Sequence, residues 1–104
     1  MAEHPPGDRE SLLRREYLSQ TARINWHDLQ AYYAHGSVVA VSAELDLVEV
    51  AVQLGLDNTD LFQDWIAAHR ITPVHDDQAL AWYEAKQELW AVVAPPWVLV
   101  QERD

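Results

Sequence analysis

The sequence predicts a small α+β domain in which a short sheet of about three strands packs against four or five helices. The chain has 104 residues, enough for one compact core, and its 49% hydrophobic and 23% charged residues are typical of a globular protein. Apolar runs with strand character alternate with segments that carry helix caps or helical periodicity. We expect a flexible N-terminal tail over residues 1–10 and a single α+β domain over residues 11–104.

The first two helices are predicted by their caps. Asp8 suits the N-cap of a helix over Arg9–Ser19, whose arginines we expect to dock on the acidic body of the domain. Asn25 suits the N-cap of a second helix over residues 26–35, and Gly36 suits a left-handed stop after it.

Residues 37–42 (SVVAVS) are β-branched and apolar on both faces, which predicts the central strand of the sheet, buried between layers. The next segment, residues 43–55, is ambiguous because its valines alternate as in a strand. We favour a helix there, since Ser42 can cap it and Glu44 and Asp46 would fall in its first turn, where carboxylates are favourable.

Two more helices are expected in the second half of the chain. One covers Asp60–His69 and should bury its apolar side chains, which are Leu61, Phe62, Trp65 and Ile66. Residues 71–74 resemble a brief extended link. The last helix covers residues 76–88, is capped by Asp76 or Asp77, and should place Leu80 and Tyr83 on its inner face.

The chain ends in two apolar segments, residues 89–94 and 97–101, which predict strands. Pro95 and Pro96 lie between them and cannot donate hydrogen bonds to a strand ladder. We expect a kink or a strand switch at this proline pair, because it does not suit a tight hairpin turn.

Composition excludes several classes of protein. The chain has no cysteine, which excludes disulfides and zinc–thiolate sites, and its three glycines are too far apart for a phosphate-binding loop. The longest apolar run is interrupted by the proline pair and is shorter than the roughly 20 residues of a membrane span. No secretory signal is recognisable, so we expect a cytoplasmic protein that does not bind a membrane.

The net charge of −10 is unevenly distributed. Residues 1–23 contain four acids and four arginines, whereas residues 24–104 contain three bases and thirteen acids and so carry the whole imbalance (3 − 13 = −10). Such a surface repels phosphate backbones, because nucleic-acid affinity comes largely from cations. We therefore expect no nucleic-acid partner, and a protein partner or self-association instead.

Three segments resemble a short bacterial family known as domain of unknown function 2288. They are Thr21–Trp26 (TARINW), Glu44–Ala51 (ELDLVEVA) and Leu89–Glu102 (LWAVVAPPWVLVQE). The likeness covers roughly residues 20–102, although two prolines precede Trp97 here where the family pattern often has one. The resemblance implies a bacterial cytosolic protein and supplies no activity and no catalytic residue.

The first candidate site is a polar stripe of Asp46, Glu49 and Gln53 on the helix expected over residues 43–55. Two carboxylates one helical turn apart can share a divalent cation such as magnesium or calcium, or split their pKa values for acid–base work. The alternative, which we favour, is that the stripe is only the solvated face of a helix that is apolar elsewhere.

Weaker metal candidates are His69, His75 and Asp76, with Asp77 beside them. Imidazole and carboxylate suit zinc or non-haem iron, but shared ligation would require the chain to reverse at Pro73. Capping and helix-dipole effects explain these residues equally well.

Aromatic side chains give the last candidate, an edge formed by Trp90 and Trp97 around the proline pair. Such an edge can line a groove for a peptide or a small molecule, or it can simply cover the sheet.

No serine, histidine and acid arrangement or HExxH motif supports a catalytic site. We therefore expect a non-enzymatic binding or protein-interaction module without a cofactor. The alternatives are a small divalent-metal-assisted enzyme and a small-molecule-binding domain that uses the Asp46 and Glu49 stripe.

Overall fold

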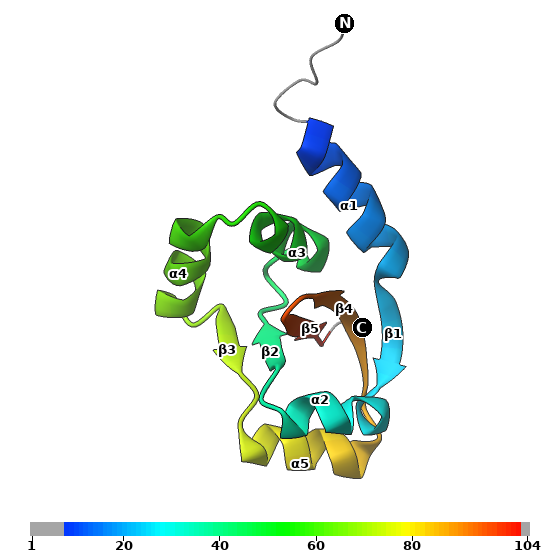
Figure 1. The fold of residues 1–104 in the computed structure, drawn as a ribbon. Coiled ribbons are helices and arrows are strands. Elements are labelled where there is room, and N and C mark those ends of the chain that lie inside the picture. Colours follow the sequence, from blue (N-terminus) through cyan, green and yellow to red (C-terminus); the bar gives the residue numbers. More distant parts are fainter. Residues whose placement is uncertain (1–7, 103–104) are drawn as a thin grey trace, which may run out of the picture.

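The computed structural model describes residues 8–102, which form five α-helices, one 3-10 helix and five strands (Figure 1). In chain order these elements are α1 (Asp8–Gln20), β1 (Ala22–Asn25), η1 (Trp26–Leu29), α2 (Gln30–Ala34), β2 (Val38–Val41), α3 (Leu47–Gly55), α4 (Thr59–Ala67), β3 (Ile71–Pro73), α5 (Asp76–Ala85), β4 (Glu88–Ala94) and β5 (Trp97–Gln101). Most of the tail expected over residues 1–10 lies outside the described residues, and residues 8–10 already belong to α1.

The five strands form one mixed sheet in the order β1-β4-β5-β2-β3, so the expectation of about three strands understates it. β5 runs parallel to β2, and the other neighbouring strands are antiparallel. The expectation that residues 37–42 form the central strand is wrong. β5 is central because it pairs with both β2 and β4, and β2 lies between β5 and the edge strand β3. The two missed strands are the edges, which have only three or four residues each and pair with segments distant in sequence.

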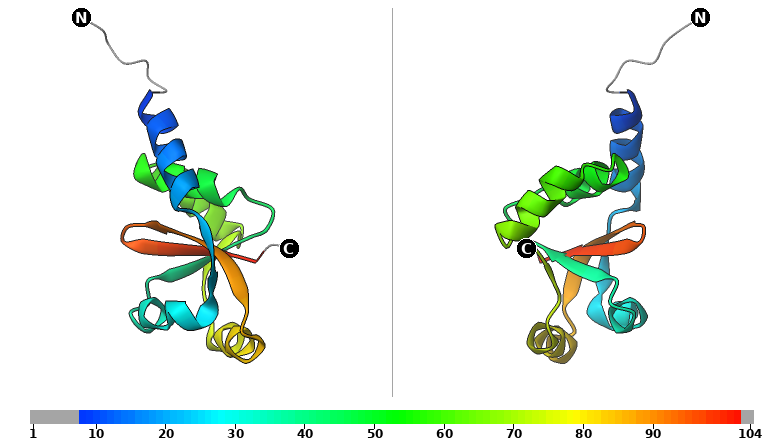
Figure 2. Two further views of the ribbon diagram at one scale, coloured as in Figure 1. Left: turned by 90° about the vertical axis from the view of Figure 1, so that its right-hand side faces the viewer. Right: turned by 60° about the vertical axis from the view of Figure 1, so that its left-hand side comes forward.

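Helices cover both faces of this sheet (Figures 1 and 2). α3, α4 and α1 lie on one face, where Leu47, Val50 and Ala51 pack on Val39 and Leu99. η1, α2 and α5 lie on the other face, where the core contains Trp26, Leu29, Ala79 and Trp82 together with Val38, Val98 and Val100. Successive residues of β2 and β5 thus enter opposite cores, which confirms that residues 37–42 are buried between layers.

The second predicted helix is confirmed as η1 followed by α2. The Asn25 side chain accepts a hydrogen bond from the His27 backbone N–H at 3.0 Å, and Gly36 ends the segment with φ of +73°. The His27 ring stacks on the Tyr83 ring, with the ring centroids 4.2 Å apart, and its Nε2 donates to the Tyr83 carbonyl. This contact joins η1 to α5.

The preferred helix over residues 43–55 begins later than expected. Ser42 starts a turn, in which its Oγ accepts from the Glu44 N–H and its carbonyl accepts from the Leu45 N–H. Asp46 is the N-cap of α3, and its carboxylate accepts hydrogen bonds from the Val48 and Glu49 N–H groups at 2.9 and 3.3 Å. Asp46 is therefore a cap, and the expectation that it lies within the first turn is wrong.

α4 exists, but it buries much less than expected. It begins after the N-cap Asn58, and none of its residues is buried. Phe62 and Trp65 are half-buried, while Ile66 is 46% exposed. The reason is its position, since α4 lies over the β3 edge of the sheet with little of the domain beyond it (Figure 1).

The inner face of α5 is also corrected. Ala79 and Trp82 face the core, whereas Leu80 and Tyr83 are 58% and 49% exposed. The N-cap is His75, without a side-chain cap, so neither aspartate has the expected capping role. The Asp76 carboxylate instead accepts a hydrogen bond from the Tyr33 hydroxyl of α2.

The expectation of a kink or strand switch at the proline pair is wrong. β4 and β5 are antiparallel neighbours, with Ala94 opposite Trp97, so Pro95 and Pro96 form the two-residue connection of a hairpin. The Pro95–Pro96 peptide bond is cis, as in type VI turns, which place a cis-proline at their third position.

The central position of β5 leads to a stability prediction. Leu99 is 0% exposed at the middle of the sheet, so Leu99→Ala should lower the free energy of unfolding by about 2–5 kcal/mol. Val93, on the neighbouring strand, is 46% exposed, and Val93→Ala should cost less than about 1 kcal/mol. Urea denaturation of both variants tests this difference. An equal loss of unfolding free energy in the two variants would contradict the position of Leu99 in the core.

Candidate functional site

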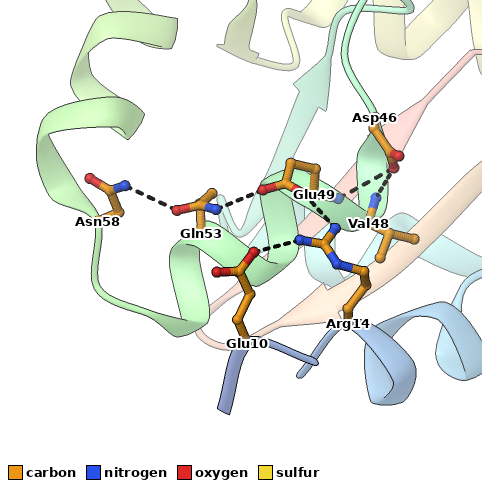
Figure 3. Close-up of polar contacts among 7 residues, drawn as sticks. All are labelled: Glu10, Arg14, Asp46, Val48, Glu49, Gln53 and Asn58. Carbon is orange, nitrogen blue, oxygen red and sulfur yellow. Dashed lines mark hydrogen bonds and ion pairs between the residues drawn. The ribbon is translucent and has the colours of Figure 1, made fainter. Parts of the chain in front are cut away.

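The stripe of Asp46, Glu49 and Gln53 is engaged within the protein (Figure 3). Glu49 forms an ion pair with Arg14 of α1, and its Oε2 accepts a hydrogen bond from Gln53 Nε2 at 2.6 Å. Arg14 also contacts Glu10 at 2.8 Å. These contacts confirm that an arginine docks α1 on the acidic body. Because Glu49 points to Arg14 and Asp46 caps α3, the two carboxylates are not directed at a common point.

The electrostatics of Glu49 agree with a structural role. Hydrogen bonds from Arg14 and then from Gln53 hold the pKa of Glu49 below its ordinary value, against the opposing effect of burial. A carboxylate that stays ionised and paired is a poor general acid near neutral pH.

The weaker metal candidates are not brought together. His69 follows α4 in a left-handed conformation, with φ of +59°, and faces a hollow beside Arg70 and Gln78. His75 and Asp76 lie at the start of α5, and Asp76 is engaged by Tyr33. Residues 8–102 contain no group of three or more potential ligands that could hold a metal ion.

Trp90 and Trp97 lie on the same face of the sheet and are half-buried against the core beneath α3 and α4. They line separate cavities, so they do not form one aromatic edge. Each tryptophan therefore belongs to a different candidate site.

The first of these sites is the Trp97 groove, which consists of two adjoining hollows of about 220 and 310 Å³. Both hollows are lined by Phe62 of α4 and by Trp97, which lie between them. Asp57 and the proline pair line the first hollow, and Ile66, Ile71 and Pro73 are among the residues that line the second. Sequence reasoning missed Phe62 and Ile66 as site residues, because it assigned them to the core.

The second site is the Trp90 cavity, of about 290 Å³. It lies between the end of α1 and the start of α3 and is lined by Leu18, Thr21, Asp46, Leu47, Val48, Trp90 and Gln101. Gln101 is the one buried polar side chain among residues 9–102. A single glutamine at an inward position of an otherwise apolar strand (WVLVQ) was the signal that could have identified it.

These features define a small α+β domain with helices on both faces of a five-stranded mixed sheet and with two recessed sites on one face. In residues 8–102 no helix is both long and apolar enough to cross a bilayer.

The chain belongs to the family described as Protein of unknown function (DUF2288), whose model matches residues 12–102 and confirms the resemblance noted above. A similar solved structure is the NMR solution structure of PA1075 from Pseudomonas aeruginosa. That protein is 38% identical, with a TM-score of 0.77 over 99% of this chain and 94% of its own. A comparison with curated proteins finds no match.

The pairing of Arg14 with Glu49 predicts a pH-dependent contribution to stability. Because folding lowers the pKa of Glu49, the contribution is present above the ordinary value of 4.5 and is lost as the pH falls through the folded value. Glu49→Gln should therefore reduce the free energy of unfolding by up to about 1 kcal/mol at neutral pH and have little effect in strong acid.

Urea denaturation at several pH values measures this difference. Glu44→Gln, which removes an exposed carboxylate in the turn before α3, is the matched control. A penalty for Glu49→Gln that did not shrink in acid would contradict the role of the ion pair.

Proposed function

We propose that this protein is a non-enzymatic interaction module whose Trp97 groove receives an apolar segment of a basic protein partner in the bacterial cytoplasm. The observation that carries the proposal is the incomplete cover that α4 gives to its side of the sheet. α4 has no buried residue, and the groove beside it remains open.

The lining of the groove suits the recognition of apolar side chains. Phe62 and Trp97 present aromatic surface, and aromatic residues dominate the energetics of protein interfaces. Ile66 is 46% exposed at the rim, while Ile71 is buried at the floor. Two adjoining hollows can accept two apolar side chains of one bound segment.

Charge supports a basic partner. Asp57 lines the groove, and Asp60 and Asp64 are exposed on α4, in a protein whose net charge is −10. Such a field attracts a partner whose apolar anchors are flanked by lysine or arginine, and it accelerates their association at low salt. A second copy of this chain has the same net charge, which opposes self-association through this face.

The alternative of a metal-assisted enzyme gains no support from the stripe on which it was based. Asp46 caps α3 through Oδ1 and Glu49 is paired with Arg14, so a cation shared by the two carboxylates would have to break the contact between Glu49 and Arg14.

Panning of a random peptide display library against the native chain tests the proposal. Enriched peptides should combine apolar residues with flanking lysine or arginine, and raising the salt concentration should weaken their binding. Ile66→Lys should lower their affinity by about tenfold or more, because it places a charged group at the rim of the groove.

The matched control is Leu80→Lys, which makes the same change at a 58% exposed position on α5, on the other face of the sheet. The control should bind the enriched peptides as the native chain does. Enriched peptides that are acidic, or that bind both variants equally, would contradict the proposal.

A further inference from the structure

We propose that the Trp90 cavity binds an alkylammonium group, that is, a primary ammonium carried on an apolar chain. This site is distinct from the Trp97 groove, and the inference does not depend on the function proposed for that groove. The cavity combines a buried, unpartnered acceptor with a carboxylate, an aromatic ring and apolar walls.

The buried acceptor is Oε1 of Gln101. The residue is 1% exposed, and its Nε2 donates to the carbonyls of Ser42 and Leu45 at 2.8 and 2.7 Å. Reversing the amide would place Oε1 against these two carbonyl oxygens, so its orientation is fixed. Oε1 has no hydrogen-bond partner in the described part of the chain, although a buried polar atom without one is costly. Because Oε1 is itself buried, the wall of the cavity that Gln101 lines must open slightly before a bound donor can satisfy it.

The other polar groups of the cavity also offer acceptors. Asp46 uses Oδ1 for the N–H groups at the start of α3, and its carboxylate retains both further lone pairs and its negative charge. The Thr21 hydroxyl donates to the Tyr17 carbonyl at 2.6 Å, which leaves its oxygen as an acceptor. None of the described residues that line the cavity carries a cationic side chain. An ammonium group supplies three donors and a positive charge, which matches this set.

Trp90 and the aliphatic walls favour an organic cation over a hydrated metal ion. The face of a tryptophan ring attracts cations. A bound ammonium would share this ring with the Arg23 guanidinium, which lies 6.0 Å from the ring centroid. Leu18, Leu47 and Val48 provide surface for the alkyl chain of the ligand. A strongly hydrated ion would gain nothing from these walls.

Titration of the full chain, followed by NMR at constant ionic strength, tests the proposal. The probes are n-butylammonium, the neutral n-butanol, and an acetylated and amidated peptide with a single lysine. The expected result is a saturable shift of the Trp90 indole and Gln101 amide signals with n-butylammonium and none with n-butanol. If the lysine peptide also binds saturably, the natural ligand is a lysine side chain of a protein. If n-butylammonium binds and the lysine peptide does not, the natural ligand is a free amine.

Asp46→Asn is the decisive variant, because asparagine is as good an N-cap as aspartate and only the charge is lost. It should weaken n-butylammonium binding by about tenfold or more. Asp64→Asn, which removes an exposed carboxylate on α4, is the matched control and should bind normally. The proposal is overturned if n-butanol shifts the same signals equally, if n-butylammonium shifts none of them, or if a folded Asp46→Asn variant binds as well as the native chain.

Discussion

The side-chain amide of Gln101 fixes the turn between β2 and α3 to the central strand of the sheet. It lies on the central strand β5, and its Nε2 binds two carbonyls of the turn that follows β2, those of Ser42 and Leu45. The turn is thereby fixed to the sheet, and α3 begins directly after it at Asp46. A buried polar group with a well-placed partner specifies geometry in a way that apolar packing does not.

The position of α3 determines how the charged residues are used. Once Asp46 caps the helix, Glu49 faces α1 and pairs with Arg14, while Gly55 at the other end of α3 allows α1 to approach closely. A Cβ on Gly55 would lie 3.2 Å from Leu13 Cδ1 and 3.3 Å from the Tyr17 hydroxyl. The acidic stripe is therefore largely structural. The two recessed sites lie beside the two ends of α3, the Trp90 cavity at its start and the Trp97 groove near its end, next to α4.

Strong local signals were sufficient for much of this fold. The caps at Asn25 and Gly36 located one helix, and apolar residues on both faces identified β2 as a strand buried between layers. The family resemblance was also recognisable from the sequence. The edge strands β1 and β3 were not recognised, because their strand conformation depends on pairing with distant segments rather than on their own composition.

The candidate site was harder to predict because side-chain direction depends on tertiary contacts. Asp46 and Glu49 look like neighbours on one helical face, yet one turns to the helix end and the other to α1. Ile66 and Leu80 have the spacing of core residues but lie on helices whose outer sides face solvent. Gln101 was overlooked because its importance comes from two carbonyls more than fifty residues away.

Amide hydrogen exchange of the Gln101→Leu variant measures whether the Gln101 amide fixes the start of α3. Losing the two hydrogen bonds should release the turn before α3, so the Val48 and Glu49 amides should lose far more protection than the Leu99 amide in the sheet. A uniform loss at all three amides, or none, would show that the amide of Gln101 does not determine where α3 begins.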